Sequence, residues 1–321
     1  MARKFFSLIA ACILLTVPLT ALAGNAWPEK PIEFVVPWKA GGGSDTMTRY
    51  IAKAIKDNQL SKEPIVVINK PGGSAQIGSA YVMSNSGSAY HWLSLSSAQI
   101  IGPVAGVGSI KASDLTPLAQ MAADTFILIT RKESKFKTIK DVLEVAKQKP
   151  KSLKMGGTGR YSDDHMCAYL FDKAAKIKSN YIAFSGGGEV MANLLGGHVD
   201  VAWANPNECM SQVKGGLVRT LAVSSEKRLA APLDCPTFSE LGLDMVFYQI
   251  RGVMAAPGMP EEARKASIEM LKKASQTKEW KDQYLKAKVL EPRFIGGKDY
   301  EALIKKTEKM VAEAVKGMKA N

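Results

Sequence analysis

Cysteine and histidine are scarce in this chain, which has four cysteines and three histidines among its 321 residues. The histidines, His91, His165 and His198, lie far from one another and from any pair of cysteines at metal-ligand spacing. Zinc and haem sites need such clusters. The sequence therefore predicts neither a bound metal nor any other cofactor.

Motifs of nucleotide binding and catalysis are missing as well. No glycine-rich stretch ends in Lys followed by Ser or Thr, and none matches the dinucleotide fingerprint after a strand. There is no Gly-x-Ser-x-Gly elbow and no set of Ser, His and acid that suggests a triad. We therefore expect no catalytic residues and no enzyme. An exported enzyme stays open as an alternative, with His165 beside Asp163 or Asp164 as its only candidate acid or base.

Long hydrophobic runs are confined to the start of the chain. Arg3 and Lys4 precede an apolar stretch over 5–17, and Ala21-Leu22-Ala23 is a small-x-small motif. This order is typical of a secretory signal peptide, so we expect residues 1–23 to be removed by cleavage near Ala23. The run is short for a membrane span, which needs about twenty residues. An uncleaved anchor and lipidation at Cys12 stay open.

Acidic residues are outnumbered by basic ones, 30 against 43, which gives a formal net charge of +13. The leader holds two basic residues and no acidic one, so the mature chain keeps 41 basic residues and a net charge of +11. This excess attracts anions but does not identify them. Because export makes nucleic acid an unexpected partner, we expect a small acidic solute instead.

Three cysteines are left once Cys12 leaves with the leader. This odd number permits at most one internal disulfide. Cys167 lies in an apolar helical pattern and is expected to be buried as a small hydrophobic residue. Cys209 and Cys235 flank turn-rich segments and could pair in an oxidising compartment, a hypothesis that the sequence leaves open.

Short β-type runs alternate with helical patterns from residue 28 onward, which predicts an α/β fold with mainly parallel sheets. We expect one lobe from 24–124, a second from 125–225, and a return to the first lobe with C-terminal helices over 226–321. Strands are expected at 32–36, 65–68, 92–95, 126–129, 181–184, 199–203, 218–223, 245–249 and 252–256. Helices are expected at 45–58, 138–149, 162–174, 189–195 and 279–287, with a long one opening at Pro260 and a terminal one from Glu301.

Three glycine-rich loops, at 38–45, 156–162 and 184–189, each lie between an expected strand and an expected helix. Glycine lets backbone N–H groups approach a ligand, and the amino end of a helix favours an anion. Such loops lie at the carboxyl ends of strands, where ligands of α/β proteins bind. The sequence thus predicts an anion site between two lobes. Asp45 and Ser162 are also expected to cap their helices.

At these loops the chain resembles the exported solute-binding proteins of tripartite tricarboxylate transporters, often called Bug or TctC-like receptors. The resemblance covers nearly all of the mature chain. It is carried by Trp27-Pro28, Pro31-Ile32, Val36-Pro37, Ala40-Gly41-Gly42 with Asp45, Asn69-Lys70-Pro71-Gly72-Gly73, Thr138-Ile139-Lys140-Asp141-Val142, Ser162 with His165, Leu194-Leu195-Gly196-Gly197-His198-Val199-Asp200, Leu221-Ala222-Val223 and Ala256-Pro257-Gly258.

The resemblance implies a monomeric, two-lobed periplasmic binding protein of type II with its ligand cleft between the lobes. It would capture a small carboxylate, whether a di- or tricarboxylate, an aromatic or an amino carboxylate. It would then deliver that acid to integral membrane transporter subunits. A receptor that reports to a membrane signalling protein shares all these features and stays open.

The same resemblance implies which residues bind the ligand. They are Ala40, Gly41, Gly42, Ser44 and Asp45 on one lobe, Gly157, Thr158, Gly159, Ser162 and His165 on the other, Ser185 and Gly186 in the third loop, and the outer side chains Trp38, Lys39, Ser97, Arg160 and Asn205. Two features of the ligand loops depart from the family pattern. Phe184-Ser185 replaces an aromatic residue and a lysine, and Asp163 and Asp164 place two negative charges where an anion is expected.

Overall fold

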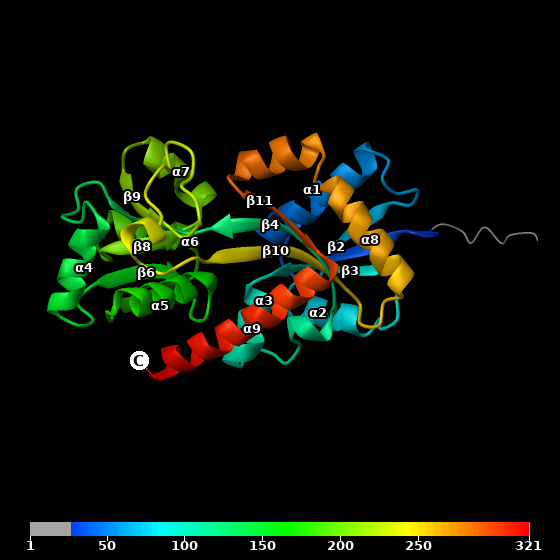
Figure 1. Ribbon diagram of the computed structural model, residues 1–321, viewed down its shortest axis with the longest axis horizontal. Helices are drawn as coiled ribbons and strands as arrows, with labels where there is room; N and C mark the ends of the chain where they lie inside the picture. The colour runs from blue at the N-terminus through cyan, green and yellow to red at the C-terminus, as the bar shows by residue number, and fades with distance from the viewer. Residues whose placement is uncertain (1–26, 321) are drawn as a thin grey trace, which may run out of the picture.

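The computed structural model describes residues 27–320, and the expected signal peptide with Cys12 lies outside them. The chain forms two α/β lobes, each built on one sheet (Figure 1). The first sheet contains β1 (Ile32–Val36), β2 (Ile65–Asn69), β3 (His91–Ser96), β4 (Thr116–Thr125), β10 (Tyr248–Ala255) and β11 (Glu291–Gly296) in the order β11-β4-β10-β3-β1-β2. The second contains β5 (Ile127–Arg131), β6 (Lys154–Thr158), β7 (Asn180–Phe184), β8 (Val201–Ala204) and β9 (Val218–Val223) in the order β7-β6-β8-β5-β9.

Both sheets are mixed, so the prediction of mainly parallel sheets was wrong. The parallel pairs are β1 with β2 and β3, and β6 with β7 and β8. The strands that carry the chain between the lobes, β4 and β10, pair antiparallel with each other and with their neighbours. The expected strands at 245–249 and 252–256 are one strand, β10, and the long β4 was not expected at all.

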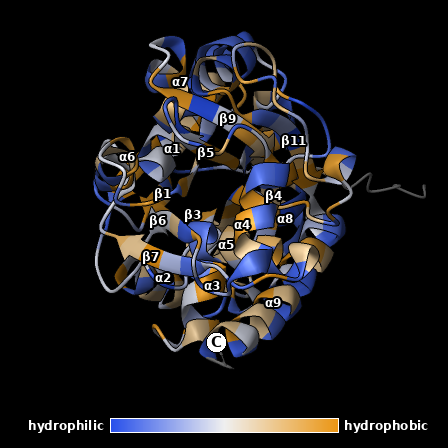
Figure 2. Cartoon of the chain, turned by 90° about the vertical axis from the view of Figure 1, so that its left-hand side faces the viewer, coloured by the Kyte–Doolittle hydropathy of each residue, from blue (hydrophilic) through white to orange (hydrophobic). Residues whose placement is uncertain are grey.

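The α-helices cover both faces of the sheets, and most lie where their apolar periodicity predicts. They are α1 (Gly43–Asp57), α2 (Gln76–Met83), α3 (Ala98–Ala105), α4 (Ile139–Gln148), α5 (Asp163–Ala175), α6 (Gly187–Leu195), α7 (Pro206–Lys214), α8 (Glu261–Ala274) and α9 (Gly297–Ala320). The expected helix at 279–287 is a π-helix over Glu279–Lys286. In α1, Met47, Ile51 and Ile55 recur at helical spacing and are buried against the first sheet. Figure 2 shows hydrophobic and hydrophilic residues occurring together along the same helices, as amphipathic helices require.

The chain passes between the lobes twice, after β4 and after β9, and a buried serine hydrogen-bonds to both of these crossings. Phe126 lies between β4 and β5, and Ser224 follows β9. The Ser224 hydroxyl accepts a hydrogen bond from the Phe126 amide (2.9 Å) and donates one to the Phe247 carbonyl (2.7 Å). The two phenylalanine rings lie 5.8 Å apart. The crossings therefore form a single packed junction between the lobes.

The last helix, α9, also connects the lobes. It packs on α3 and β4, and its far end reaches α5 of the second lobe (Figure 1). Gly317 lies against Tyr169 so closely that a Cβ at this position would be 2.3 Å from the phenol oxygen. A side chain at position 317 would therefore force Tyr169 to move.

Cys167, Cys209 and Cys235 are buried free thiols in the structure, so the hypothesis of a Cys209–Cys235 disulfide was wrong. Cys209 and Cys235 belong to one apolar cluster of the second lobe, and burial raises the pKa of both thiols, to about 12 and about 11. Buried thiols that stay protonated react slowly, because the thiolate is the nucleophile.

We therefore expect three titratable thiols in the unfolded mature protein without reductant, and almost none in the folded protein over minutes. A thiol-reactive dye added with and without guanidinium chloride measures both numbers. A single reactive thiol after unfolding would mean that two cysteines pair after all.

Among residues 27–320, no helix has the length and apolar character needed to cross a membrane.

Candidate functional site

A cleft of about 450 Å³ lies between the two lobes. The amino ends of four helices line it, with Gly42, Gly43 and Ser44 at α1, Ala98 at α3, Ser162, Asp163 and Asp164 at α5, and Asn205, Asn207 and Glu208 at α7. The first N–H groups of a helix have no acceptor within it and carry partial positive charge. Four such ends at one cavity favour an anion. The volume is typical of small-molecule sites, which measure about 300 to 1,000 Å³.

Asp45 holds the first glycine loop in place from inside the protein. It is the third residue of α1 and 3% exposed, and the helix cap is Gly42, so the expected capping role of Asp45 was wrong. Its carboxylate accepts hydrogen bonds from the Gly41 amide (2.9 Å) and from the Asn69 side-chain amide (2.9 Å). The Gly41 amide is thus already bonded. Gly42, Gly43 and Ser44 line the cleft, so the amino end of α1 is the part of this loop that a ligand can reach.

The second loop is held in the same way. Asp164 accepts a hydrogen bond from the Thr158 amide (2.7 Å), and Phe184 accepts one from the Gly159 amide (2.8 Å). Ser162 caps α5 as expected, because its hydroxyl accepts from the His165 amide. Gly157 lies inside β6 rather than in a turn, and a Cβ there would be 2.5 Å from the Tyr181 hydroxyl. This loop therefore offers side-chain groups and the amino end of α5 to a ligand.

Among the described residues that line the cleft, Arg251 alone is basic, and no sequence motif predicted it. It projects from β10 and forms an ion pair with Asp124 at the end of β4. Asp124 is fully buried, and burial raises its pKa in spite of the guanidinium. Gly43 gives Arg251 its space, since a Cβ at that position would be 2.8 Å from Nη1.

Asp163 and Asp164 bring acidic groups to the same cleft. They are 7% and 6% exposed, and burial raises the pKa of Asp163 to about 6 and that of Asp164 to about 7. The Gln249 side chain donates a hydrogen bond to Asp163 Oδ2 (3.0 Å), which opposes the shift without cancelling it. At neutral pH both carboxyl groups are therefore partly protonated.

The ligand-free protein should be more stable at pH 5 than at pH 8. An aspartate has a pKa of about 3.9 in an unfolded chain, so at intermediate pH the folded state binds more protons at Asp163 and Asp164 than the unfolded state does. Their contribution to stability is complete below pH 4 and is lost as pH rises through about 6 and about 7.

The melting temperature measured across that interval tests this prediction. Asp164→Asn should flatten the slope, while Asp282→Asn at an exposed position should leave it unchanged. A wild-type slope no steeper than that of Asp164→Asn would contradict the prediction.

The structure brings some of the predicted ligand residues together and places others elsewhere. Trp38, Gly42, Ser44, Thr158, Ser162 and Asn205 line the cleft. Lys39, Ala40 and Gly41 are exposed on the same loop, and Ser97 is buried with its hydroxyl accepting from the Ile250 amide. The third loop, at 184–189, does not line the cleft. Its Ser185 is bound by Glu189, and Gly187 lies against Glu208, which does line the cavity.

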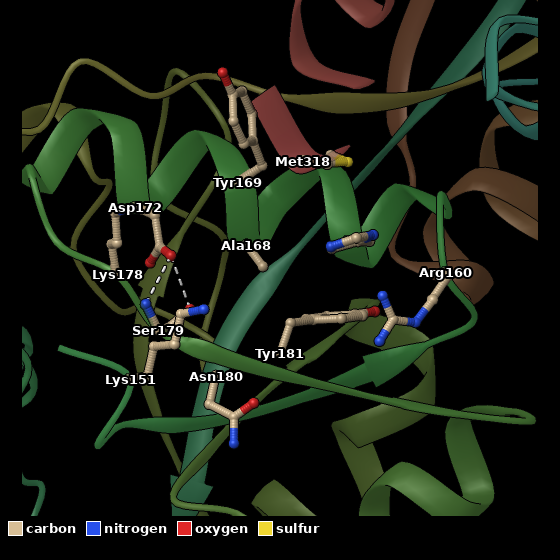
Figure 3. A pocket seen from close by; sticks show the side chains of 11 residues that line it. Lys151, Arg160, Ala168, Tyr169, Asp172, Lys178, Ser179, Asn180, Tyr181 and Met318 are labelled. Atoms are coloured by element: carbon tan, nitrogen blue, oxygen red, sulfur yellow. Dashed lines mark hydrogen bonds between the residues drawn. The ribbon is translucent and has the colours of Figure 1, made fainter. Parts of the chain in front are cut away.

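Arg160 and His165 line a different, smaller pocket of about 210 Å³, together with Tyr181, Asp172 and Met318 of α9. Figure 3 shows Arg160 pointing toward Tyr181 in this pocket. The His165 ring stacks on Tyr181 with centroids 4.3 Å apart, and burial lowers the pKa of His165 to about 4. His165 therefore stays neutral and supports the loop, since its Nδ1 accepts a hydrogen bond from the Tyr161 amide.

The cleft residues that sequence reasoning missed come mostly from the crossings and from the helix ends. They are Gly43, Ser96, Ala98, Phe126, Asn207, Glu208, Gln249 and Arg251. No motif marks them. The one available signal was the pair of polar residues Gln249 and Arg251, which alternate with apolar residues in β10.

Comparison with known proteins agrees with this geometry. The chain is similar to Protein BugT of Bordetella pertussis, at 27% identity over 69% of this chain and 68% of that protein. It is similar to the crystal structure of a TctC solute-binding protein from Polaromonas, solved without ligand, with a TM-score of 0.81, 26% identity and coverage of 91% and 99%. MatC from Rhodopseudomonas palustris with bound malate shares the fold, with a TM-score of 0.69, 19% identity and coverage of 90% and 100%.

The fold is that of periplasmic solute-binding proteins, as the sequence predicted. The model of the tripartite tricarboxylate transporter family receptors matches residues 47–319. Members of that family are substrate-binding receptors rather than enzymes. The chain belongs to the TctC family of tripartite tricarboxylate transporter receptors.

Proposed function

We propose that this protein is a periplasmic receptor that binds a small organic carboxylate in the cleft between its lobes and presents it to the membrane subunits of a tripartite tricarboxylate transporter. The observation that carries the proposal is the meeting of four helix amino ends and Arg251 at one cavity. These groups donate hydrogen bonds and create a positive potential, so they can bind an anion without reacting with it. The malate bound to the similar fold of MatC supports the ligand class.

Ligand binding would act by closing the lobes. A ligand held by α1 of the first lobe gains contacts with α5 and α7 of the second only when the cleft is shut, so it raises the population of the closed state. The Ser224 junction supplies the pivot. The closed form, as a monomer, would then dock on the transporter.

Thermal unfolding with a panel of acids tests the proposal. Succinate, malate, citrate, adipate, benzoate and a set of amino acids should include at least one compound that raises the melting temperature, because a ligand selective for the folded state stabilises it. The amides of the same compounds are the matched controls and should have no effect. If no acid shifts the transition at millimolar concentration, the proposal is wrong.

Export is part of the proposal and has its own test. The protein expressed with its native leader should accumulate in the periplasmic fraction, with a mature amino terminus close to Gly24, because the apolar run and the Ala21-Leu22-Ala23 motif suit signal peptidase. Intact-mass measurement of the purified periplasmic protein determines the cleavage position. A product that keeps residues 1–23, or that carries lipid at Cys12, would contradict the expectation.

A further inference from the structure

The acidic residues of the cleft outnumber its basic ones. Asp163, Asp164 and Glu208 line it, against the guanidinium of Arg251 alone. Arg251 already pairs with the buried Asp124, so part of its charge is compensated inside the protein. A ligand that carries only negative charge would therefore meet carboxylates as well as helix ends. A ligand with charge of both signs would complement both sets of groups.

Asp163 points to where the positive part of that ligand would bind. Its side chain is more than nine-tenths buried and lines the cleft. Oδ2 accepts a hydrogen bond from Gln249, whereas Oδ1 is buried and has no hydrogen-bond partner among the described residues. The nearby Ser97 hydroxyl and Arg251 guanidinium favour the charged form of Asp163, but they do not outweigh its burial, and its pKa stays raised. A buried acceptor without a donor is costly, and the cost is about 1 to 3 kcal/mol or more for a charged group. A donor on the ligand would remove it.

The groups that suit a carboxylate come from other elements of the same cleft. The first turn of α1 contributes Gly43 and Ser44, whose amides have no acceptor within the helix, and β10 contributes the guanidinium of Arg251, which lies against Gly43. Asp163 belongs to α5 on the second lobe. The donor groups and the unpaired acceptor thus belong to different lobes, and a ligand that bridges them would hold the lobes together.

We propose that the ligand is an amino carboxylate whose carboxylate binds at the first turn of α1 and Arg251 and whose ammonium group binds Oδ1 of Asp163. This inference rests on the proposed function and narrows its ligand class. Glu208 lines the same cavity at the amino end of α7, and burial of its carboxyl group raises its pKa. An ammonium group would supply the donor that Oδ1 of Asp163 lacks, and it would bring positive charge to a cavity lined by three acidic side chains.

Calorimetry at pH 7.5 with pairs of acids that differ only in the amino group tests the proposal. The pairs are aspartate and succinate, glutamate and glutarate, 4-aminobutyrate and butyrate, and leucine and 4-methylpentanoate. In the pairs that bind, the amino acid should bind about 10- to 100-fold more tightly, the range expected for a hydrogen bond to a charged group. If the amino-free acids bind equally well or better, the inference is wrong and the proposed function stands. If none of these acids binds, the inference is wrong, and the proposed function is then decided by the wider panel of acids in the thermal-unfolding test.

Asp163→Asn locates the ammonium group. This variant should bind the amino acid no better than its amino-free partner, while the partner binds as well as before or better. Asp172→Asn, a half-buried aspartate of the same helix outside the cleft, is the matched control and should keep the wild-type ratio. An unchanged ratio in Asp163→Asn would overturn the placement. The wild-type ratios test the ligand class even if this variant does not fold.

Discussion

Arg251→Gln should lower the free energy of unfolding at pH 8 by about 3 to 5 kcal/mol, the usual cost of leaving one partner of a buried ion pair alone. Asp124 has no solvent exposure and relies on Arg251 for its charge. Without the guanidinium, this carboxylate must either stay ionised in the protein interior or take up a proton. Urea denaturation followed by circular dichroism measures the loss.

Three comparisons define this effect. The loss should shrink at pH 5, where protons are available to neutralise Asp124. The double variant Arg251→Gln with Asp124→Asn should recover most of the stability, because it leaves no unpaired charge. Arg228→Gln removes one partner of an ion pair with Glu240 whose side chains are 54% and 46% exposed, and it should cost less than about 1 kcal/mol. An Arg251→Gln variant as stable as Arg228→Gln would contradict the prediction.

Gly43→Val should weaken ligand binding by about 10- to 100-fold, since overpacking a filled site costs about 1 to 3 kcal/mol. Gly43 lines the cleft at the first turn of α1, and a Cβ there would press on Nη1 of Arg251 at 2.8 Å. The valine would both move the guanidinium and cover the amides of the helix end. Calorimetry with the acid that gives the largest thermal shift measures the change.

Gly188→Val is the matched control. Gly188 lies in the first turn of α6, outside the residues that line the cleft, and no atom stands within 4 Å of the position of its Cβ. This variant should keep the wild-type affinity and stability. Equal affinities of the two variants would show that the ligand does not use the first turn of α1.

The sequence predicted the elements that have a clear local period, and it missed those defined by distant partners. The helix α1 and the strands β1 and β9 lie close to their expected bounds because their apolar spacing is regular. β4 reads Thr-Pro-Leu-Ala-Gln-Met-Ala-Ala-Asp-Thr, which has little β-branched character, and its pairing comes from β10 and β11 far along the chain. Such a strand forms because of its tertiary contacts, so local β-propensity does not predict it.

The candidate site was likewise predicted only where its residues form a local sequence pattern. The loops at 38–45 and 156–162 were correctly expected to meet, because a glycine-rich turn before a helix is visible in the sequence. Which amides they offer was not predictable, since Asp45 and Asp164 use two of them. Arg251 and Gln249 reach the cleft only because β10 is inserted between β3 and β4.

The strand order also determines which lobe can fold first as the chain emerges. All strands of the second sheet lie between Ile127 and Val223 in one uninterrupted stretch. In the first sheet, β4 has neighbours only in β10 and β11, which are synthesised more than a hundred residues later. During translocation the second lobe can therefore fold before the first lobe is complete. Until β10 and β11 emerge, β4 has no strand partner and its edge is exposed. A chaperone would protect the chain most during this period.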